Sequence, residues 1–395
     1  MTSYSTPPVS DLELYSEEAL HDPYEMYREL RDLGPVVYLS AYEMYAIPRY
    51  QPLREASLNW EVFSSANGVM MNDTINKATE GIVLCSDPPE HQVMRKVLER
   101  PLRPDRLNDI TPLIQQEATA VVERLVAQGT FDAATELAQH LPLTIVSKLV
   151  GLGDYGRERM LEWAAAGFDA QGPMNQRTIA AMPKARELID FALNEAKPGQ
   201  IDPDGWAAAL YEAGERGELP PEKCPLMVID YTGPSLDTTI FGTSSAIWLF
   251  AQHPEQWDLL REKPSLIRHA INEVLRLESP IQRFSRLVTR DYEIDGMTIP
   301  AGARVMLLYG SANRDERKYP EPDRFDITRR PSDQLAFGHG EHACVGMNLA
   351  RLEIRSLLEA LVQQVERFEL IGYERAVNQT LRGLARLDVR VREVA

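Results

Sequence analysis

Apolar side chains recur three and four positions apart along much of this sequence, and this spacing limits the possible folds more than any other feature. The pattern runs over residues 107–150, 157–166 and 182–195. A period near 3.6 residues places such side chains on one face of a helix, and that face must pack against other helices. The middle of the chain is therefore predicted to be a helical array.

The last third of the chain changes to a strand pattern. Residues 287–289, 292–294 and 305–308 are rich in β-branched and large apolar side chains, and Asp295-Gly296 is typical of a hairpin turn. No internal repeat or long linker divides the sequence. We therefore predict an α+β fold, mainly α, that forms a single domain over residues 1–395, with a long central helix and small β-sheets. We expect residues 1–20 to be a loosely ordered N-terminal segment.

Charge and cysteine content narrow the possible partners. The chain has 42 Lys and Arg against 59 Asp and Glu, a net charge of −17, so nucleic acid and anionic membrane surfaces would be repelled. No run of about 18 apolar residues suits a membrane span, and the first residues lack a signal-peptide pattern. Three scattered cysteines argue against a disulfide framework. We expect a cytoplasmic monomer without nucleic-acid or membrane partners.

The sharpest local motif surrounds one of these cysteines. The run Phe337-Gly338-His339-Gly340-Glu341-His342-Ala343-Cys344-Val345-Gly346 precedes a predicted amphipathic helix. Two glycines allow a tight turn, and Cys344 is expected at the first helical turn, where unpaired N–H groups favour a thiolate. Such a thiolate can be a nucleophile, a zinc ligand or an axial ligand to haem iron, and a buried free thiol is the alternative. Zinc is disfavoured because the sequence has no second ligand pair.

This run resembles the haem-binding signature of the cytochrome P450 superfamily. The resemblance rests on six fixed residue types, namely Phe337, Gly338, Gly340, His342, Cys344 and Gly346. It implies heme b as the cofactor, with Cys344 as the proximal ligand to the iron. A thiolate ligand pushes electron density toward iron and favours O–O cleavage.

A second motif, Glu273-Val274-Leu275-Arg276, resembles the family's Glu-x-x-Arg pair, which supports the haem loop from a helix. It is followed in the family's order by Ser279-Pro280, the small sheet, Pro322-Asp323-Arg324-Phe325 and the cysteine loop. The resemblance therefore implies a structural role for Glu273, Arg276 and Arg324. The alternative is an ordinary surface pair on one helix face.

A third motif could bind the carboxylates of the cofactor. His91 and Arg95 lie four residues apart on a predicted helix and resemble the family's propionate-binding pair. Two buried carboxylates need charged partners, and His91, Arg95, Arg286 and His342 would supply them. For Arg95 the alternative is a solvated helix charge.

The predicted central helix, over about residues 225–251, contains Tyr231-Thr232-Gly233-Pro234-Ser235-Leu236-Asp237-Thr238-Thr239. By resemblance this is the segment that activates O2, with Gly233 beside the cofactor and with Asp237 and Thr238 as its acid and alcohol. The family usually has Ala or Gly and then Gly where this chain has Pro234 and Ser235. Proline removes a helical hydrogen bond, so we predict a kink and an opened groove over residues 230–234, with room for water.

The resemblance implies a monooxygenase that inserts one atom of O2 into a C–H bond of a small hydrophobic substrate. The overall pattern is most similar to members that hydroxylate or O-demethylate small aromatics. Residues 66–69 lack the arginine of benzoate-binding members, so a neutral methoxyaromatic or an alkylphenol fits at least as well. The predicted pocket, for which core packing is the alternative, comprises Val69, Met70, Met71, Val83, Phe168, Tyr231, Ile281, Phe284 and Leu381.

Electrons must come from another protein, because the chain has no flavin or nicotinamide fingerprint. A ferredoxin and its ferredoxin reductase are the expected donors. A basic patch could receive an acidic partner, and it comprises Arg95, Lys96, Arg100, Arg103, Arg106, Arg351 and Arg355. A peroxide-driven haem enzyme and a haem-based sensor protein remain the alternatives.

Overall fold

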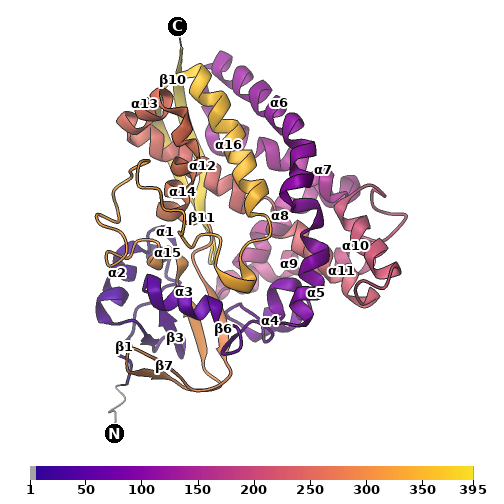
Figure 1. Cartoon of the computed structure of the whole chain (residues 1–395), viewed down its shortest axis with the longest axis vertical. Coiled ribbons are helices and arrows are strands. Elements are labelled where there is room, and N and C mark those ends of the chain that lie inside the picture. The colour runs from indigo at the N-terminus through magenta and orange to yellow at the C-terminus, as the bar shows by residue number, and fades with distance from the viewer. Residues whose placement is uncertain (1–5, 395) are drawn as a thin grey trace.

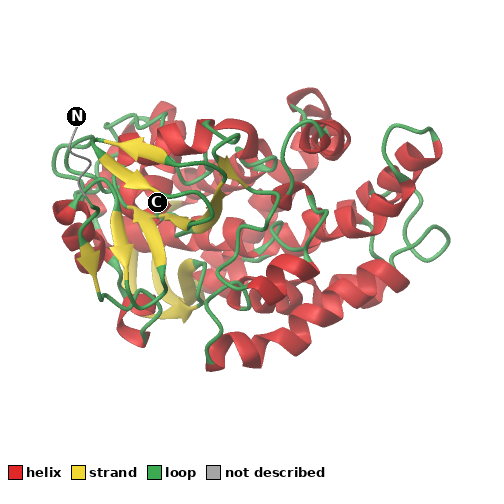
Figure 2. Cartoon of the chain, turned by 90° about the horizontal axis from the view of Figure 1, so that it is seen from below, coloured by secondary structure: helices red, strands yellow, loops and turns green. Residues whose placement is uncertain are grey.

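Helices make up most of the chain in the computed structural model, which describes residues 6–394, and the strands gather toward one side (Figures 1 and 2). Helix α6 shows why the apolar spacing gives this result: it buries Leu107, Ile114, Ala118, Val121 and Leu125 along one stripe. That stripe packs against α16, and α8 packs against α9 in the same way. The predicted helical array is confirmed.

The helices follow one another along the chain, with the longest connections on either side of α15. They are α1 (Glu17–His21), α2 (Tyr24–Leu33), α3 (Tyr50–Leu58), α4 (Asp73–Ala78), α5 (Glu90–Leu98), α6 (Pro104–Gln128), α7 (Ser147–Val150), α8 (Gly153–Asp169), α9 (Gln176–Asn194), α10 (Trp206–Glu215), α11 (Cys224–Thr232), α12 (Asp237–Gln252), α13 (Pro254–Glu262), α14 (Ile267–Glu278), α15 (Tyr309–Ala312) and α16 (Met347–Gln364).

The strands form three small sheets. The largest has the order β1-β2-β3-β9-β6-β4, the second β10-β11-β5, and β7 pairs with β8 alone. Asp295 and Gly296 join β7 to β8 with φ values of 49° and 78°, as a two-residue hairpin turn requires. The strands are β1 (Val9–Ser10), β2 (Val37–Leu39), β3 (Met44–Ile47), β4 (Phe63–Ser64), β5 (Thr130–Asp132), β6 (Phe284–Val288), β7 (Tyr292–Ile294), β8 (Met297–Ile299), β9 (Arg304–Leu307), β10 (Val365–Val377) and β11 (Arg382–Glu393).

The beginning of the chain is more ordered than the sequence suggested. Residues 1–5 lie outside the described part, but Val9 and Ser10 pair in parallel with β2. Leu14 is completely buried, and its carbonyl accepts a 2.7 Å hydrogen bond from Nη1 of Arg283. The prediction of a loosely ordered segment over residues 1–20 is therefore wrong for residues 6–20, because apolar side chains and sheet pairing fix this segment to the body.

The predicted central helix is divided in two. Helix α11 ends at Thr232, α12 begins at Asp237, and residues 233–236 form bends. Pro234 has no N–H to donate, so the backbone cannot continue its ladder of hydrogen bonds there. The predicted kink is confirmed as a complete break. Within residues 6–394, no helix combines the length and the apolar character that crossing a membrane requires.

Candidate active site

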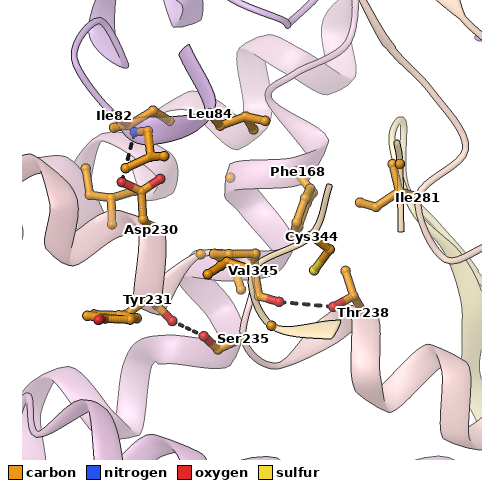
Figure 3. Close-up of a pocket in the computed structure, with 18 of the residues that line it drawn as sticks. Ile82, Leu84, Phe168, Asp230, Tyr231, Ser235, Thr238, Ile281, Cys344 and Val345 are labelled. Atoms are coloured by element: carbon orange, nitrogen blue, oxygen red, sulfur yellow. Dashed lines mark hydrogen bonds between the residues drawn. The ribbon is translucent and has the colours of Figure 1, made fainter. Parts of the chain in front are cut away.

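The break between α11 and α12 opens onto a cavity of about 290 Å³. The start of α16 and the loop before it form one wall, and the 3₁₀ turn Val83–Cys85, α8 and β6 contribute the others. Figure 3 shows Cys344, Thr238, Phe168 and Ile281 around this space. Segments far apart in the sequence therefore place a sulfur, a hydroxyl and apolar side chains in one chamber.

The loop before α16 fixes Cys344 in this chamber. Gly338 and Gly340 adopt φ values of 68° and 75°, in the left-handed region that other residues avoid. A Cβ atom at Gly340 would lie only 2.4 Å from the carbonyl oxygen of Ser57 in α3, so the close approach also requires glycine. The N–H of Cys344 donates to the carbonyl of Phe337 at 2.8 Å. The surface that Cys344 exposes faces the cavity.

The protonation of Cys344 differs from the prediction based on the helix dipole. Burial raises the pKa of its thiol, although the N–H groups of Gly346 and Met347 and the charge of Arg95 oppose this effect. Helix α16 begins only at Met347, three residues after the cysteine. The chain alone therefore favours the thiol, and a bound metal cation is needed to make this sulfur a stable thiolate.

Four nitrogen-bearing side chains meet beside the cysteine. The rings of His91 and His342 lie 4.5 Å apart, and both ring nitrogens of His91 are buried without a hydrogen-bond partner. Arg95 donates to the carbonyl of Ala343 at 2.7 Å, and Arg286 is 5% exposed with a bond only to the carbonyl of its neighbour, Ser285. Burial, Arg286, His91 and Arg95 lower the pKa of His342 to about 2.

This cluster has few anions of its own. Among the described residues, Glu99 lies 3.9 Å from Nε of Arg95, and Asp87 lies 4.0 Å from Nε2 of His342 and already accepts bonds from Ser64 and Ser65. Buried cations and unpartnered ring nitrogens are costly unless an anion pairs with them. The two carboxylates of haem would meet this need beside a cysteine ligand, so the residues present fit that cofactor. Phe337, Gly338, Gly346 and Gly233, which are also expected to contact the cofactor, line the same cavity.

Asp237 and Thr238 lie at the first turn of α12. Oγ1 of Thr238 donates to the carbonyl of Pro234 at 3.0 Å, and this side chain lines the cavity (Figure 3). Asp237 is 4% exposed, does not line the cavity, and its Oδ2 atom has no hydrogen-bond partner. Burial raises the pKa of Asp237 to about 7. The pair therefore places a hydroxyl in the chamber and, behind it, an acid that titrates near neutral pH.

The structure contains the predicted Glu273–Arg276 pair, but its second arginine is Arg329 and not Arg324. Glu273 and Arg276 are both fully buried and bond at 2.8 Å, and Nη1 of Arg276 reaches the carbonyls of Asn313 and Pro322. Arg329 contacts Glu273 at 3.1 Å. Arg324 lies at the surface, 58% exposed, in a pair with Glu321, so its predicted structural role is wrong. Both arginines follow the same proline-rich passage, and spacing alone could not distinguish them.

Most of the residues predicted for the substrate pocket line the cavity, namely Met70, Val83, Phe168, Tyr231, Ile281 and Phe284. Val69, Met71 and Leu381 are buried outside the lining, where Val69 and Met71 belong to separate apolar clusters and Leu381 forms a β-bridge with Ile281. Their assignment to the pocket is wrong, because these side chains pack in the protein interior instead.

Two acidic residues of the lining were missed at the level of sequence. Asp230 of α11 and Glu353 of α16 both contact the cavity, and burial raises the pKa of Glu353 to about 8. Asp230 lies in an otherwise apolar helical stretch, whereas Glu353 lies between Arg351 and Arg355. A carboxylate in an apolar stretch signals a specific environment, and that signal could have identified Asp230 but not Glu353.

Known proteins resemble this chain over nearly its full length. The family described as Cytochrome P450 matches residues 172–372. "Cytochrome p450 CYP199A2" of Rhodopseudomonas palustris (strain ATCC BAA-98 / CGA009) is 36% identical over 94% of this chain and 91% of its own. Linalool 8-monooxygenase of Pseudomonas putida is 32% identical over 97% of this chain and 98% of its own.

Solved structures of cytochromes P450 also resemble this chain over nearly its full length. P450BioI, in complex with a hexadec-9Z-enoic acid ligated acyl carrier protein, superposes with a TM-score of 0.85 at 26% identity and covers 95% of this chain and 100% of that one. Cytochrome P450 CREJ, in complex with (4-ethylphenyl) dihydrogen phosphate, gives 0.83 at 26% identity over 94% and 98%. With the cysteine loop, the buried Glu273–Arg276 pair and the acid–alcohol pair in place, this chain belongs to the cytochrome P450 family and is a haem monooxygenase.

Proposed function

We propose that this P450 hydroxylates or O-demethylates a small aromatic substrate, with heme b as its cofactor. One observation carries the proposal: Cys344 and Thr238 face the same cavity, whose remaining lining is mainly apolar and includes Phe168 and Phe284. A chamber of this kind suits a small ring better than a charged or extended molecule. The aromatic ligand named for the neighbour CREJ gives independent support.

Haem bound through Cys344 would supply O2 binding and C–H oxidation. The chain's residues then have separate tasks. His91, Arg95, Arg286 and His342 would pair with the haem carboxylates and so fix the orientation of the ring. The apolar lining excludes water and holds the substrate.

Proton supply would fall to the start of α12. The hydroxyl of Thr238 is held by the Pro234 carbonyl at 3.0 Å and keeps its lone pairs toward the chamber. Asp237, with its pKa raised to about 7, can gain and lose a proton near neutral pH. Pro234 and Ser235 keep this turn out of the regular helix, and the Ser235 hydroxyl donates to the carbonyl of Tyr231.

We also propose a ferredoxin and its reductase as the electron source, with a cytoplasmic monomer as the working form. Lys96 and Arg106 are exposed at α5 and the start of α6, and within the described residues neither has an acidic partner. Four other members of the predicted basic patch are partly neutralised, and Arg95 is one of them, 3.9 Å from Glu99. Arg100 pairs with Glu218, Arg103 lies 3.7 Å from Asp105, and Arg355 lies 3.7 Å from Glu359.

Thr238→Ala tests the proposed chemistry. The assay uses para-substituted methoxybenzenes and a ferredoxin–reductase system. We expect product formation to fall at least tenfold, since a positioned proton donor accelerates a reaction about 10²–10⁴-fold. Substrate affinity should stay unchanged, because the hydroxyl bonds to the backbone. Product per electron consumed is the measurement.

The alternatives give different results in the same assay. A peroxide-driven enzyme would form product with hydrogen peroxide but none with the ferredoxin–reductase system, and Thr238→Ala would not change its rate. A sensor protein would bind haem and aromatics without any product. Either outcome contradicts the proposed function.

A further inference from the structure

Asp230 places a carboxylate in the part of the cavity opposite the cysteine loop. Among the described residues that line the cavity, the acidic ones are Asp230 and Glu353, and Glu353 belongs to α16, the helix that follows Cys344. Figure 3 shows Asp230 beside Ile82 and Leu84, away from Cys344 and Thr238. Asp230 is therefore the acidic group that could contact the end of a substrate that points away from Cys344.

The carboxylate of Asp230 is directed into the cavity and not into solvent. Its residue keeps some exposed surface, yet it lies deep in the chain, and burial raises its pKa to about 7. Oδ2 accepts a 3.1 Å hydrogen bond from the N–H of Val83, and the N–H of Leu84 also lowers the pKa of this carboxyl. A carboxylate has about four acceptor positions, so these two N–H groups leave others facing the chamber.

The neighbouring polar groups are already committed. The hydroxyl of Thr79 donates to the carbonyl of Ile75 at 2.8 Å, and Ser235 donates to the carbonyl of Tyr231. Arg95, the cation that lowers the pKa of Asp230, directs its guanidinium to Ala343. Among the described residues, Asp230 thus has backbone donors but no side-chain donor, and buried acceptor positions left open are costly unless a ligand or water completes them.

We propose that Asp230 anchors the substrate by accepting a hydrogen bond from an O–H group, so that the substrate is a phenol and not a benzoate. This inference rests on the proposed function. Above about pH 7, where Asp230 is ionised, a benzoate carboxylate would meet its like charge, whereas a phenolic hydroxyl would complete its acceptor positions. Asp230 lies on α11 and Thr238 on α12, on either side of the helix break, so a hydroxyl held at Asp230 lies away from Thr238 (Figure 3). The opposite end of the ring then points toward the reacting side.

The test compares three ligands of similar size with haem-loaded protein: 4-methoxyphenol, 4-methoxytoluene and 4-methoxybenzoate. Their Kd values follow from the change in haem spin state. We expect the wild type to bind the phenol at least tenfold more tightly than the toluene, and the benzoate most weakly. A hydrogen bond to a charged group supports a difference of this size.

Asp230→Asn provides the decisive comparison. Its amide oxygen can still accept from Val83, so its NH₂ group faces the chamber as a donor. We expect the preference for the phenol over the toluene to fall below threefold and the benzoate to gain affinity. Asp154→Asn, at a residue whose side chain is 83% exposed on α8, is the matched control and should leave all three Kd values unchanged. If Asp230→Asn loads haem poorly, Asp230→Ser supplies the same comparison.

The outcomes separate the two claims. If the three ligands shift the spin state but their Kd ratios are the same in the wild type and in Asp230→Asn, Asp230 only caps the turn Val83–Cys85. The inference is then wrong while the proposed function stands. If none of the aromatics shifts the spin state or is converted, the proposed function itself is wrong.

Discussion

Buried carboxylates have different partners on the two sides of the cavity, the side of the cysteine loop and the side of α11 and α12. Behind the cysteine loop, Glu273 is fully buried but bonded to both Arg276 and Arg329. Across the cavity, Asp230 has only backbone N–H groups, those of Val83 and Leu84, as donors, and Oδ2 of Asp237 has no partner among the described residues. Burial raises the pKa of both aspartates to about 7, whereas the pairing around Glu273 completes its acceptor positions. We call the side with Glu273 the fixed side, because its carboxylate is fully paired. We call the side with Asp230 and Asp237 the exchanging side, because its carboxylates can exchange protons and ligands.

This contrast shows where the molecule gains rigidity and where it gains chemistry. A buried ion pair with all its hydrogen bonds made holds segments in one arrangement, and removing one partner is strongly destabilising. Unpartnered buried carboxylates reduce stability, and they are typical of sites that bind or transfer protons. The two sides should therefore respond differently to the same change from acid to amide.

The largest effect is expected on the fixed side, for Glu273→Gln. The substitution leaves Arg276 and Arg329 without their counter-charge, and breaking a buried pair in this way costs about 3–5 kcal/mol. We expect a corresponding loss in the free energy of unfolding in urea, together with poor haem loading. Arg324→Ala, at the exposed residue of the same passage, is the control and should change stability by less than about 0.5 kcal/mol. Equal losses in the two variants would show that the Glu273 cluster does not hold the loop.

A smaller change in the free energy of unfolding, this time a gain, is expected for Asp237→Asn on the exchanging side. The folded-state pKa of about 7 lies above the ordinary value of 3.8, so the unfolded chain releases this proton first. Ionisation therefore destabilises the fold progressively from about pH 4 to pH 7, and the loss is complete above that range. Asp237→Asn removes this loss and should be more stable than the wild type by about 2 kcal/mol at pH 8.

The measurement for Asp237→Asn is the urea midpoint between pH 4 and pH 9. The gain over the wild type should grow to pH 7 and then level off. Product formation should fall at the same time, because the variant cannot release a proton. Parallel curves for the two proteins would contradict an unpartnered, titrating Asp237.

The smallest effect concerns the outer surface on the cysteine side. We expect Arg103→Glu combined with Arg106→Glu to slow ferredoxin-supported turnover a few-fold at low salt, and the difference from wild type to shrink at high salt. Haem content and peroxide-supported turnover are the controls and should not change. An unchanged ferredoxin-supported rate would show that these arginines form only a solvated surface.

The sequence predicted the fixed side better than the exchanging side. The motif around Cys344 and the Glu273–Arg276 pair are local patterns, so the spacing of their residues is enough to predict their local structure. Arg329, Asp230 and the exclusion of Met71 from the pocket depend on how distant segments meet, and no local spacing encodes that. Pro234 is the instructive exception, because a missing N–H is a local fact that predicted the break between α11 and α12.

The central claim is that Cys344 binds haem iron as a thiolate in a monooxygenase site. The carbon monoxide difference spectrum of the reduced, haem-loaded protein tests it most directly. The account predicts the red-shifted band of thiolate-bound haem in the wild type and its loss in Cys344→His, with Cys224→Ser as an unaffected control. A histidine-type band in the wild type, or a thiolate-type band that survives in Cys344→His, would contradict the account.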